Sequence, residues 1–250
     1  MLKIRPIPAF QDNYIWMIQN GNHVAVIDPG DAAPVISTLQ KENLTLDAIL
    51  ITHHHNDHIG GVQNLLKEYQ TQVFAPANES FDFTHRAVRE NDLIHLPNLK
   101  LNLSVLDIPG HTNGHVAYYG LNHLFCGDTL FGGGCGRLFE GTYEQLFNSL
   151  QKLAALPDET LVYCAHEYTE HNLRFANLVD SKNAALINRI ILTNRVRASN
   201  TPSLPSSIGL EKETNPFLRC DDQTIASALG LQAPDTITVF KTLRNMRNNF

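Results

Sequence analysis

The sequence predicts an α/β fold followed by a smaller helical domain, and two observations lead to this prediction. Up to about residue 168, short runs rich in β-branched and aromatic residues alternate with helical patterns. From about residue 169 onwards only helical patterns follow, with a Pro- and Ser-rich link, NTPSLPSS, between two of them. A chain of 250 residues can bury a substantial core. We therefore expect an α/β domain over residues 1–170 and an α-helical domain over residues 171–250.

Several runs in the first domain have the composition of strands. NYIWMIQN and HVAVIDPG are typical of consecutive strands closed by a Pro-Gly turn. LDAILIT is nearly all apolar, which indicates a buried strand. The later runs of the same kind are TQVFAPA, LNLSVLDIPG, HVAYYGL, HLFCGDTLF and TLVYCAHEY.

Helical patterns separate these runs and fill the second domain. In the first domain they are DAAPVISTLQKEN, GGVQNLLKEYQ and TYEQLFNSLQKLAALP; in the second they are EHNLRFANLVD, NAALINRIILTNRVRAS, TIASALG and TITVFKTLRNMRNNF. In the last helix, Arg247 falls within an apolar arc and Arg244 lies towards its edge. Arg247 either extends to solvent from a frayed end, or reaches a binding site where this helix packs against the first domain. We expect the second arrangement.

Composition excludes several classes of protein. The net charge of −6 and the pI near 6.0 argue against a nucleic-acid-binding protein. Four cysteines without a CxxC pair argue against both a disulfide framework and a Cys-rich zinc finger. Neither a signal peptide nor a long apolar run is evident. We expect a cytoplasmic monomer that binds a small molecule, not a nucleic acid or a membrane.

The stretch THHHNDHIGG follows the buried strand LDAILIT, at the point where the strand opens into a loop. Residues two apart in extended backbone point the same way, so His53 and His55 can converge on one point. Asp57 and His58 follow as the chain turns. These side chains cannot all reach one ion without strain, but two neighbouring ions can share them. A solvated polar strand end is the alternative.

Further metal-binding side chains follow three later strands. PGHTNGH places His111, CGDTLF places Asp128 and CAHEY places His166 at strand ends. Ligand sites gather at such ends in layered α/β folds. The result is a nitrogen and oxygen ligand set that needs no thiolate, so we expect Cys126 and Cys164 to pack in the core. Of the other histidines, we expect His54 to bind no metal and His115 to support a ligand.

The motif HxHxDH with separate His, Asp and His resembles the metallo-β-lactamase superfamily. Within it, the chain is similar to the glyoxalase II family, the hydroxyacylglutathione hydrolases. The similarity extends over nearly the whole length, through DNYIWMI, IDPGD, THHHNDHIGG, PGHTNGH, FCGDTLFGGGCGRLFEGT, YCAHEYTEHNLRFA and ETNPFLR. The segments GGCGRLFEGT, HEYTEHN and NPFLR are specific to this branch. The resemblance implies an α/β (α+β sandwich) αββα fold with a C-terminal helical domain.

The resemblance also implies roles for individual residues. One metal would be held by His53, His55 and His111, a second by Asp57, His58 and His166, and Asp128 would bridge the two. Asp57 and Asp128 would also act in catalysis, Asp57 by orienting the nucleophile. We expect two divalent ions per chain, of zinc, with iron and manganese as alternatives.

The family's reaction is hydrolysis of S-D-lactoylglutathione and related S-2-hydroxyacylglutathiones to D-lactate and glutathione, the second step of methylglyoxal detoxification. Two cations make hydroxide available at neutral pH, and it attacks the thioester carbonyl. A thiol has a pKa of about 8.5, so the thiolate leaves with little need for a general acid. The implied substrate-binding residues are Arg137, Tyr168, Arg244 and Arg247, with Asn172 as a weaker candidate.

Two positions depart from the family's pattern. Phe139 stands where some relatives carry Tyr, so the chain lacks a hydroxyl at this position. The hydrogen bond that this hydroxyl could make would contribute about 1 kcal/mol. Arg137 stands where relatives often have Lys, which keeps the charge but changes its reach. Both changes bear on glutathione affinity.

Two other hypotheses remain open at this point. The first is that the chain is another hydrolase of the superfamily, a β-lactamase or a phosphodiesterase. Asp128 argues against a β-lactamase, because β-lactamases of this fold generally lack the bridging carboxylate, and the acidic pI argues against a nuclease. A non-catalytic metal-binding or interaction protein on this scaffold is the second hypothesis. Degenerate members lose ligands, whereas this sequence keeps the complete set.

Overall fold

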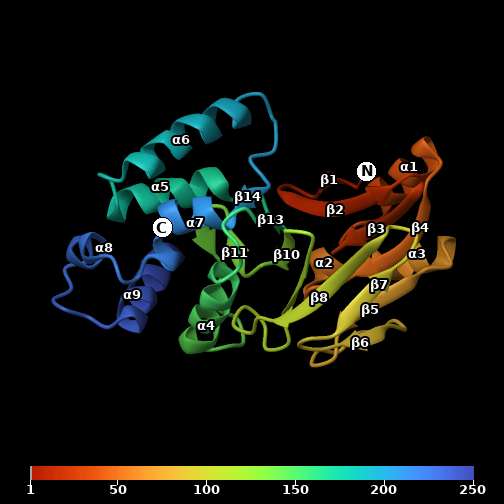
Figure 1. Ribbon diagram of the computed structural model, residues 1–250, viewed down its shortest axis with the longest axis horizontal. Helices are drawn as coiled ribbons and strands as arrows, with labels where there is room; N and C mark the ends of the chain where they lie inside the picture. Colours follow the sequence, from red (N-terminus) through yellow and green to blue (C-terminus); the bar gives the residue numbers. More distant parts are fainter. Residues whose placement is uncertain (1) are drawn as a thin grey trace. The chain divides into compact units, whose positions relative to one another are not determined.

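A computed structural model describes residues 2–250 and divides them into two compact units. Unit 1 contains the residues through Asp107 together with Asn113–Gly127, and unit 2 contains Ile108–Thr112 and Asp128–Phe250. The elements of each unit are labelled in Figure 1. Among the described helices, none combines the length and apolar character of a membrane span.

The first sheet of unit 1 is mixed and runs in the order β1-β2-β3-β4-β5-β6. Antiparallel pairing joins the first three strands, and parallel pairing joins β3 to β4, β4 to β5 and β5 to β6. The strands are Lys3–Ala9, Asn13–Asn20, His23–Ile27, Thr45–Leu50, Gln72–Pro76 and Arg86–Val88. Parallel neighbours put the ends of β3 and β4 at the same edge of the sheet.

Three helices of unit 1 connect these strands in the sequence: α1 (Ala32–Glu42) follows β3, and α2 (Asn56–Ile59) and α3 (Val62–Glu68) follow β4. Helix α1 begins at Asp31, whose side chain accepts a hydrogen bond from the Ala33 N–H. It ends at Asn43, which adopts a left-handed conformation with φ 52°. Apolar side chains of α1 and α3, including Val35 and Leu65, pack with those of the sheet into one core.

A second set of strands in unit 1 pairs antiparallel in chain order: β7 (Leu93–Leu96), β8 (Leu101–Asp107), β9 (Val116–Gly120) and β10 (His123–Gly127). The buried Tyr118 hydroxyl of β9 donates to the Ile51 carbonyl just after β4, at 2.5 Å. This contact and the Val116 N–H to Thr52 carbonyl bond connect the second set to the first sheet. The chain thus has the α/β sandwich that was predicted.

Unit 2 is mostly helical. It contains the short hairpin β11 (Leu130–Phe131) and β12 (Gly134–Cys135), and the pair β13 (Leu161–Cys164) and β14 (Ser206–Ser207). Its helices are α4 (Tyr143–Ala154), α5 (Thr169–Val179), α6 (Ala184–Arg197), α7 (Ile208–Thr214), η1 (Pro216–Leu218), α8 (Gln223–Ala228) and α9 (Thr236–Asn248). Helices α5 and α6 lie side by side (Figure 1).

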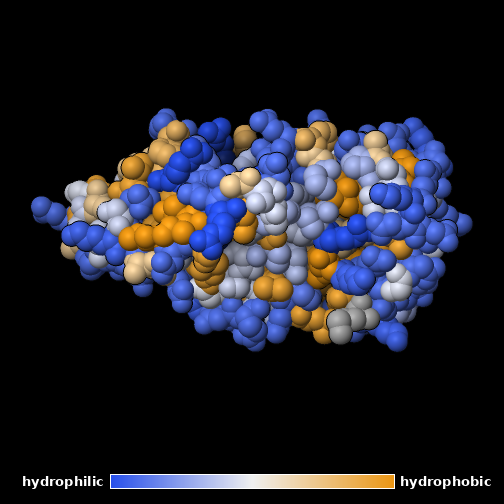
Figure 2. Space-filling view, turned by 90° about the horizontal axis from the view of Figure 1, so that it is seen from above, coloured by the Kyte–Doolittle hydropathy of each residue, from blue (hydrophilic) through white to orange (hydrophobic). Residues whose placement is uncertain are grey.

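Aromatic side chains form much of the core of unit 2. Phe240 of α9 lies 5.5 Å from Phe147 of α4 and 5.9 Å from Phe217 of η1, measured between ring centroids. Phe217 in turn stacks on Phe175 of α5 at 6.0 Å. The last helix therefore packs against α4, which lies within the range 1–170 that was predicted for the first domain. Figure 2 shows that apolar side chains on one face of the molecule form islands among hydrophilic ones.

The two units do not coincide with the predicted ranges 1–170 and 171–250. Helix α4, which belongs to the first predicted range, packs with α7, η1 and α9. The segment Ile108–Thr112 also joins unit 2, because the Gly141 N–H donates to the Gly110 carbonyl at 3.1 Å and the Ser149 hydroxyl donates to the Pro109 carbonyl at 2.7 Å. The division near residue 170 stays a prediction.

Candidate metal centre

His53 and His55 converge just beyond β4, as extended backbone requires. His53 Nε2 lies 3.0 Å from His55 Nδ1, and the other ring nitrogen of His53 lies 3.1 Å from the Thr52 hydroxyl. His53 is fully buried, and its ring stacks on that of His115 with centroids 4.5 Å apart. His115 therefore supports His53 through ring packing. His54 points elsewhere, with its Nδ1 3.1 Å from a carboxylate oxygen of Glu79.

Asp57 and His58 form a second pair in unit 1. His58 Nε2 lies 3.5 Å from Asp57 Oδ2, and both residues belong to the short helix α2. Asn13 donates its amide to the same Asp57 oxygen at 3.0 Å. His58 Nδ1 lies 3.0 Å from a carboxylate oxygen of Asp28. Because Nδ1 is engaged there, Nε2 is the nitrogen left to bind a metal.

Asp28 contacts residues of the candidate site, and the sequence reasoning left it without a role. It is buried at the end of β3, where it adopts a left-handed conformation with φ 52° that aspartate tolerates better than most residues. Its carboxylate accepts from the Thr52 N–H and from the Thr52 hydroxyl, both at 2.7 Å. Asp28 thus fixes both the strand end that carries His53 and the ring of His58. An acidic residue directly after an apolar strand, in IDPGD, was the available signal.

In unit 2, His111 is held by backbone. Its Nδ1 lies 2.7 Å from the Arg137 carbonyl, so Nδ1 carries the proton and Nε2 is available. The loop approaches closely at Gly136, where a Cβ would lie 1.9 Å from the Asp128 carbonyl oxygen. Glycine is required at this position, because any side chain would push Arg137 away from His111.

The carboxylate of Asp128 lies between two imidazoles. Its Oδ2 is 3.5 Å from His111 Nε2, and its Oδ1 is 3.4 Å from His166 Nε2. His166 is buried, and its ring stacks on that of Tyr168 with centroids 4.6 Å apart and planes 4° from parallel. Each oxygen of one carboxylate thus faces a different histidine, which is the arrangement that a bridging ligand needs.

The distances within these pairs fit metal ligands. Three of them are 3.4 or 3.5 Å, which is longer than a good N–H···O hydrogen bond. Two ligand atoms at about 2.0–2.1 Å from a tetrahedral ion are separated by about 3.3 Å. Imidazole and carboxylate are also the donors that zinc, iron and manganese accept. The donor set and its spacing therefore suit divalent metal in both units.

A cavity of about 260 Å³ in unit 2 is lined by two of the candidate metal ligands, His111 and Asp128. It also contains every substrate-binding residue that the sequence predicted, and Asn172 and Phe139 as well. Its lining is His111, Asp128, Phe131, Cys135, Arg137, Phe139, Tyr168, Asn172, Arg244 and Arg247. Three guanidinium groups beside a metal site suit a substrate that carries negative charge.

Sequence comparisons identify both parts of the chain. Residues 10–166 match the family model described as metallo-beta-lactamase superfamily, and residues 167–250 match that described as hydroxyacylglutathione hydrolase C-terminus. A protein of Methylobacillus flagellatus named hydroxyacylglutathione hydrolase is 54% identical over 250 residues, which is 100% of both chains. This chain belongs to the hydroxyacylglutathione hydrolase family.

Two solved structures of the same fold are less similar in sequence to this hydroxyacylglutathione hydrolase than the Methylobacillus protein is. ETHE1 from Myxococcus xanthus is 26% identical, with a TM-score of 0.65 over 99% of this chain and 98% of that one. TTHA1623, solved in a di-iron-bound form, is also 26% identical, with a TM-score of 0.60 over 86% of this chain and 100% of that one. Membership of this superfamily supports divalent-metal binding, for which the His and Asp clusters described above are the candidate sites.

The two arginines of α9 that line the cavity of this hydrolase have different partners. Arg247 contacts the Asn172 amide oxygen through Nε at 3.2 Å and Nη2 at 3.0 Å. Burial, followed by the neighbouring Arg244 charge, lowers the pKa of Arg247 to about 10, so it stays charged at pH 7. Arg244 is buried and donates to the Cys135 carbonyl at 2.8 Å. Arg244 therefore secures the loop before Arg137.

The cysteines do not compete with the metal ligands. Cys126 and Cys164 are completely buried among core residues of the hydrolase. Cys135 lines the cavity, but burial raises the pKa of its thiol, so the thiol is neutral at pH 7. A neutral thiol is a poor nucleophile, so Cys135 is a weak candidate for attack on a substrate.

Proposed function

We propose that this chain hydrolyses S-D-lactoylglutathione, and related S-2-hydroxyacylglutathiones, to D-lactate and glutathione. One observation carries the proposal: the cavity that contains His111 and Asp128 also contains three arginines. A hydrolytic centre beside concentrated positive charge suits a thioester whose thiol part carries carboxylates. The relatives named hydroxyacylglutathione hydrolase support the same substrate.

We further propose two metal ions per chain, with zinc as the metal. The ligand assignment that the family resemblance implies is His53, His55 and His111 for one ion, Asp57, His58 and His166 for the other, and Asp128 for both. The pairs within each unit support it, because each unit offers two pairs of ligand atoms. Bound divalent ions would acidify water and polarise the thioester carbonyl.

The chain's own residues orient this chemistry. Asn13 holds Asp57 by its Oδ2, so that the carboxylate keeps one orientation towards the nucleophile. The Arg137 carbonyl and the Asp28 carboxylate hold the Nδ1 atoms of His111 and His58, which directs both Nε2 atoms to the metals. Arg247 and Tyr168 would bind the glutathione part. No acid is needed for the thiolate, whose conjugate thiol has a pKa of about 8.5.

The experiment that tests the proposed function compares three substrates under identical conditions. Purified protein is incubated with S-D-lactoylglutathione, nitrocefin and bis-p-nitrophenyl phosphate, and its metal content is measured alongside. We expect kcat/KM for the thioester to exceed both others by at least about a hundredfold, because only the thioester uses the arginine-lined cavity. Comparable turnover of either rival substrate would refute the assignment. So would full activity with less than one metal per chain.

Arg247→Gln is expected to raise KM for S-D-lactoylglutathione about tenfold and to change kcat less than about threefold. A charge-assisted hydrogen bond contributes about 1.5–3 kcal/mol, and this one is made equally in the bound substrate and the transition state. The free protein should lose little stability, because removal of a charge that burial and Arg244 disfavour offsets the lost hydrogen bonds to Asn172. Steady-state kinetics and thermal melting measure these effects.

Arg195→Gln is the matched control, because Arg195 is exposed in the last turn of α6. It should leave both constants unchanged. An unchanged KM in Arg247→Gln would show that this arginine does not bind glutathione. The expectation of a cytoplasmic monomer without nucleic-acid or membrane partners stays a prediction from the sequence.

A further inference from the structure

The glycine-rich segment from Phe131 to Gly136 joins two parts of the proposed site. Asp128 lies just before it and Arg137 just after it. Only the short hairpin β11–β12 supports it as regular structure. Side chains from the helices of unit 2 bind most of its remaining backbone groups. The position of the segment therefore depends on residues that are distant in the sequence.

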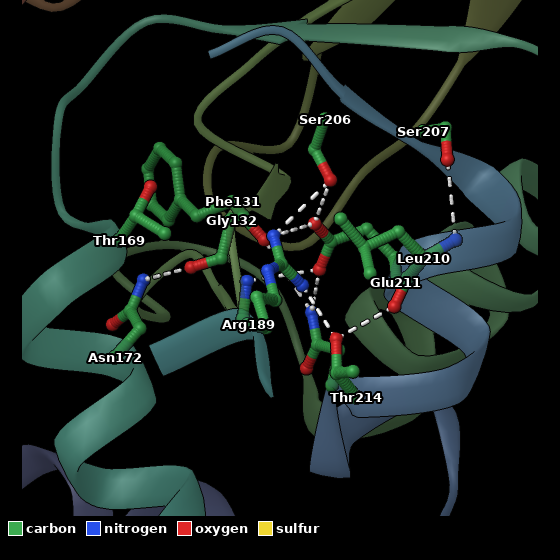
Figure 3. A network of polar contacts seen from close by, with 12 residues as sticks. Phe131, Gly132, Thr169, Asn172, Arg189, Ser206, Ser207, Leu210, Glu211 and Thr214 are labelled. Atoms are coloured by element: carbon green, nitrogen blue, oxygen red, sulfur yellow. Dashed lines mark hydrogen bonds and ion pairs between the residues drawn. The ribbon is translucent and has the colours of Figure 1, made fainter. Parts of the chain in front are cut away.

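Glu211 of α7 is the central residue of this arrangement, and it is fully buried. One carboxylate oxygen accepts from the Gly133 N–H at 2.9 Å and from the Asn215 amide at 3.0 Å. The other oxygen accepts from Arg189 at 2.5 Å and from the Ser206 hydroxyl. Figure 3 shows Glu211 and Arg189 pointing towards each other from α7 and α6. These four partners hold both carboxylate oxygens in one position.

Arg189 balances the charge of Glu211 and is itself buried. Besides the carboxylate, it donates to the Thr214 hydroxyl at 2.6 Å and to the Ser206 hydroxyl at 3.1 Å. Replacing a buried ion pair by apolar residues is often neutral for stability, so stability alone is a weak reason for a pair here. We call Arg189, Glu211 and Asn215 the Gly133 clamp.

Other side chains bind the segment on either side of Gly133. Asn215 donates to the Gly134 carbonyl at 2.9 Å. Asn172 donates to the Gly132 carbonyl at 3.1 Å (Figure 3). Arg244 binds the Cys135 carbonyl. Asn172 also accepts from Arg247, so the same amide touches the segment and a proposed substrate-binding residue.

The glycines allow this close packing. Gly133 has φ +67°, and a Cβ there would lie 2.7 Å from a methyl carbon of Leu173. At Gly134 a Cβ would lie 2.6 Å from the Asn172 side-chain Cγ. Helix α5 can therefore approach the segment this closely only because Gly133 and Gly134 have no side chains.

We propose that Glu211, balanced by Arg189, is a positioning residue for substrate binding. By holding the Gly133 N–H it fixes the segment that sets the cavity side chains Cys135 and Arg137. This inference rests on the proposed function for the identity of the substrate. It assigns a role in binding to a buried ion pair outside the metal site and outside the cavity lining.

Two double variants separate positioning from fold stability. Arg189→Met with Glu211→Gln removes both charges but keeps an oxygen that can accept from Gly133. Arg189→Met with Glu211→Leu removes the same charges and the acceptor. We expect the second variant to exchange the Gly133 amide hydrogen at least tenfold faster than the first. We also expect its KM for S-D-lactoylglutathione to be at least fivefold higher, with kcat within about threefold and equal metal content.

Equal Gly133 exchange and equal KM in the two variants would overturn the proposal. The wild-type protein gives a test that does not depend on the folding of either variant. Its Gly133 amide should exchange as slowly as the amides of α5, and exchange at the rate of a surface loop would also overturn the proposal. Glu213→Gln, an exposed change on the same helix, is the control and should alter neither measurement. If the wild type fails to hydrolyse S-D-lactoylglutathione, the proposed function fails, whereas the exchange measurements still report on the clamp.

Discussion

Asp128→Asn is expected to lower kcat/KM for S-D-lactoylglutathione at least about 1,000-fold and to reduce the metal bound by the purified protein. The two carboxylate oxygens face His111 Nε2 at 3.5 Å and His166 Nε2 at 3.4 Å. Asparagine keeps one oxygen and replaces the other by an amide nitrogen, which cannot bind a cation. One of the two proposed ions would therefore lose a ligand, and the charge that would offset both ions is removed.

The measurements are steady-state kinetics and metal analysis by mass spectrometry on the same preparation. Asp158→Asn is a matched control, because the Asp158 side chain is 69% exposed and pairs with Lys212. It should keep full activity and full metal content. An Asp128→Asn protein that keeps two ions and more than a tenth of the activity would disprove the bridging role.

Much of the fold could be predicted because the core strands are apolar and bounded by turn residues. The strands around NYIWMIQN, HVAVI and LDAIL and the helix after Asp31 lie where the pattern places them. Strand β1 was not predicted, because Pro6 and Pro8 interrupt its pattern; both are tolerated because β1 is an edge strand. Strands β6 and β7 are short and partly exposed, and helix α7 is too short for an apolar period to be recognised.

The metal ligands could be proposed from the sequence because their chemistry is local. Each candidate follows a strand, and residues at strand ends meet at one edge of a layered fold. The sequence does not show which nitrogen of each ring is free. That depends on distant groups, such as the Arg137 carbonyl that holds His111 and the Asp28 carboxylate that holds His58.

The roles of the two arginines of α9 also required three-dimensional information. The apolar arc of the helix placed Arg247 inside it and Arg244 towards its edge, whereas in the structure Arg244 is buried, Arg247 is half-buried and both line the cavity. Arg244 was predicted to bind substrate, and it too lines the cavity, but its Nη1 is occupied by the Cys135 carbonyl. A helical pattern gives the direction of a side chain but not the partner it meets there. The bond between Glu211 and Gly133 links residues 78 positions apart and leaves no local pattern.

Asp28→Asn is expected to weaken metal binding about 10–100-fold and to lower kcat/KM to a similar degree at limiting metal. The Asp28 carboxylate accepts from the Thr52 N–H, from the Thr52 hydroxyl and from His58 Nδ1. Asparagine offers only one oxygen to these donors. Its NH2 group, itself a donor, would then face the N–H of His58 Nδ1 or a donor of Thr52, and no hydrogen bond can form there. The His58 ring then rotates or changes tautomer, and its Nε2 is no longer held towards the metal.

A second carboxylate–histidine contact in unit 1 provides the control. Asp47 Oδ1 lies 3.0 Å from His23 Nδ1, the same kind of contact at the same distance, but neither residue is a proposed ligand. Asp47→Asn should therefore leave metal affinity unchanged. Because Asp28→Asn is expected to weaken affinity without removing a ligand, excess zinc should restore most of kcat. Asp128→Asn should not recover in this way, since it lacks the ligand itself. If excess metal fails to restore Asp28→Asn, or if Asp47→Asn weakens metal binding equally, then Asp28 acts through the fold of unit 1 and not through the orientation of His58.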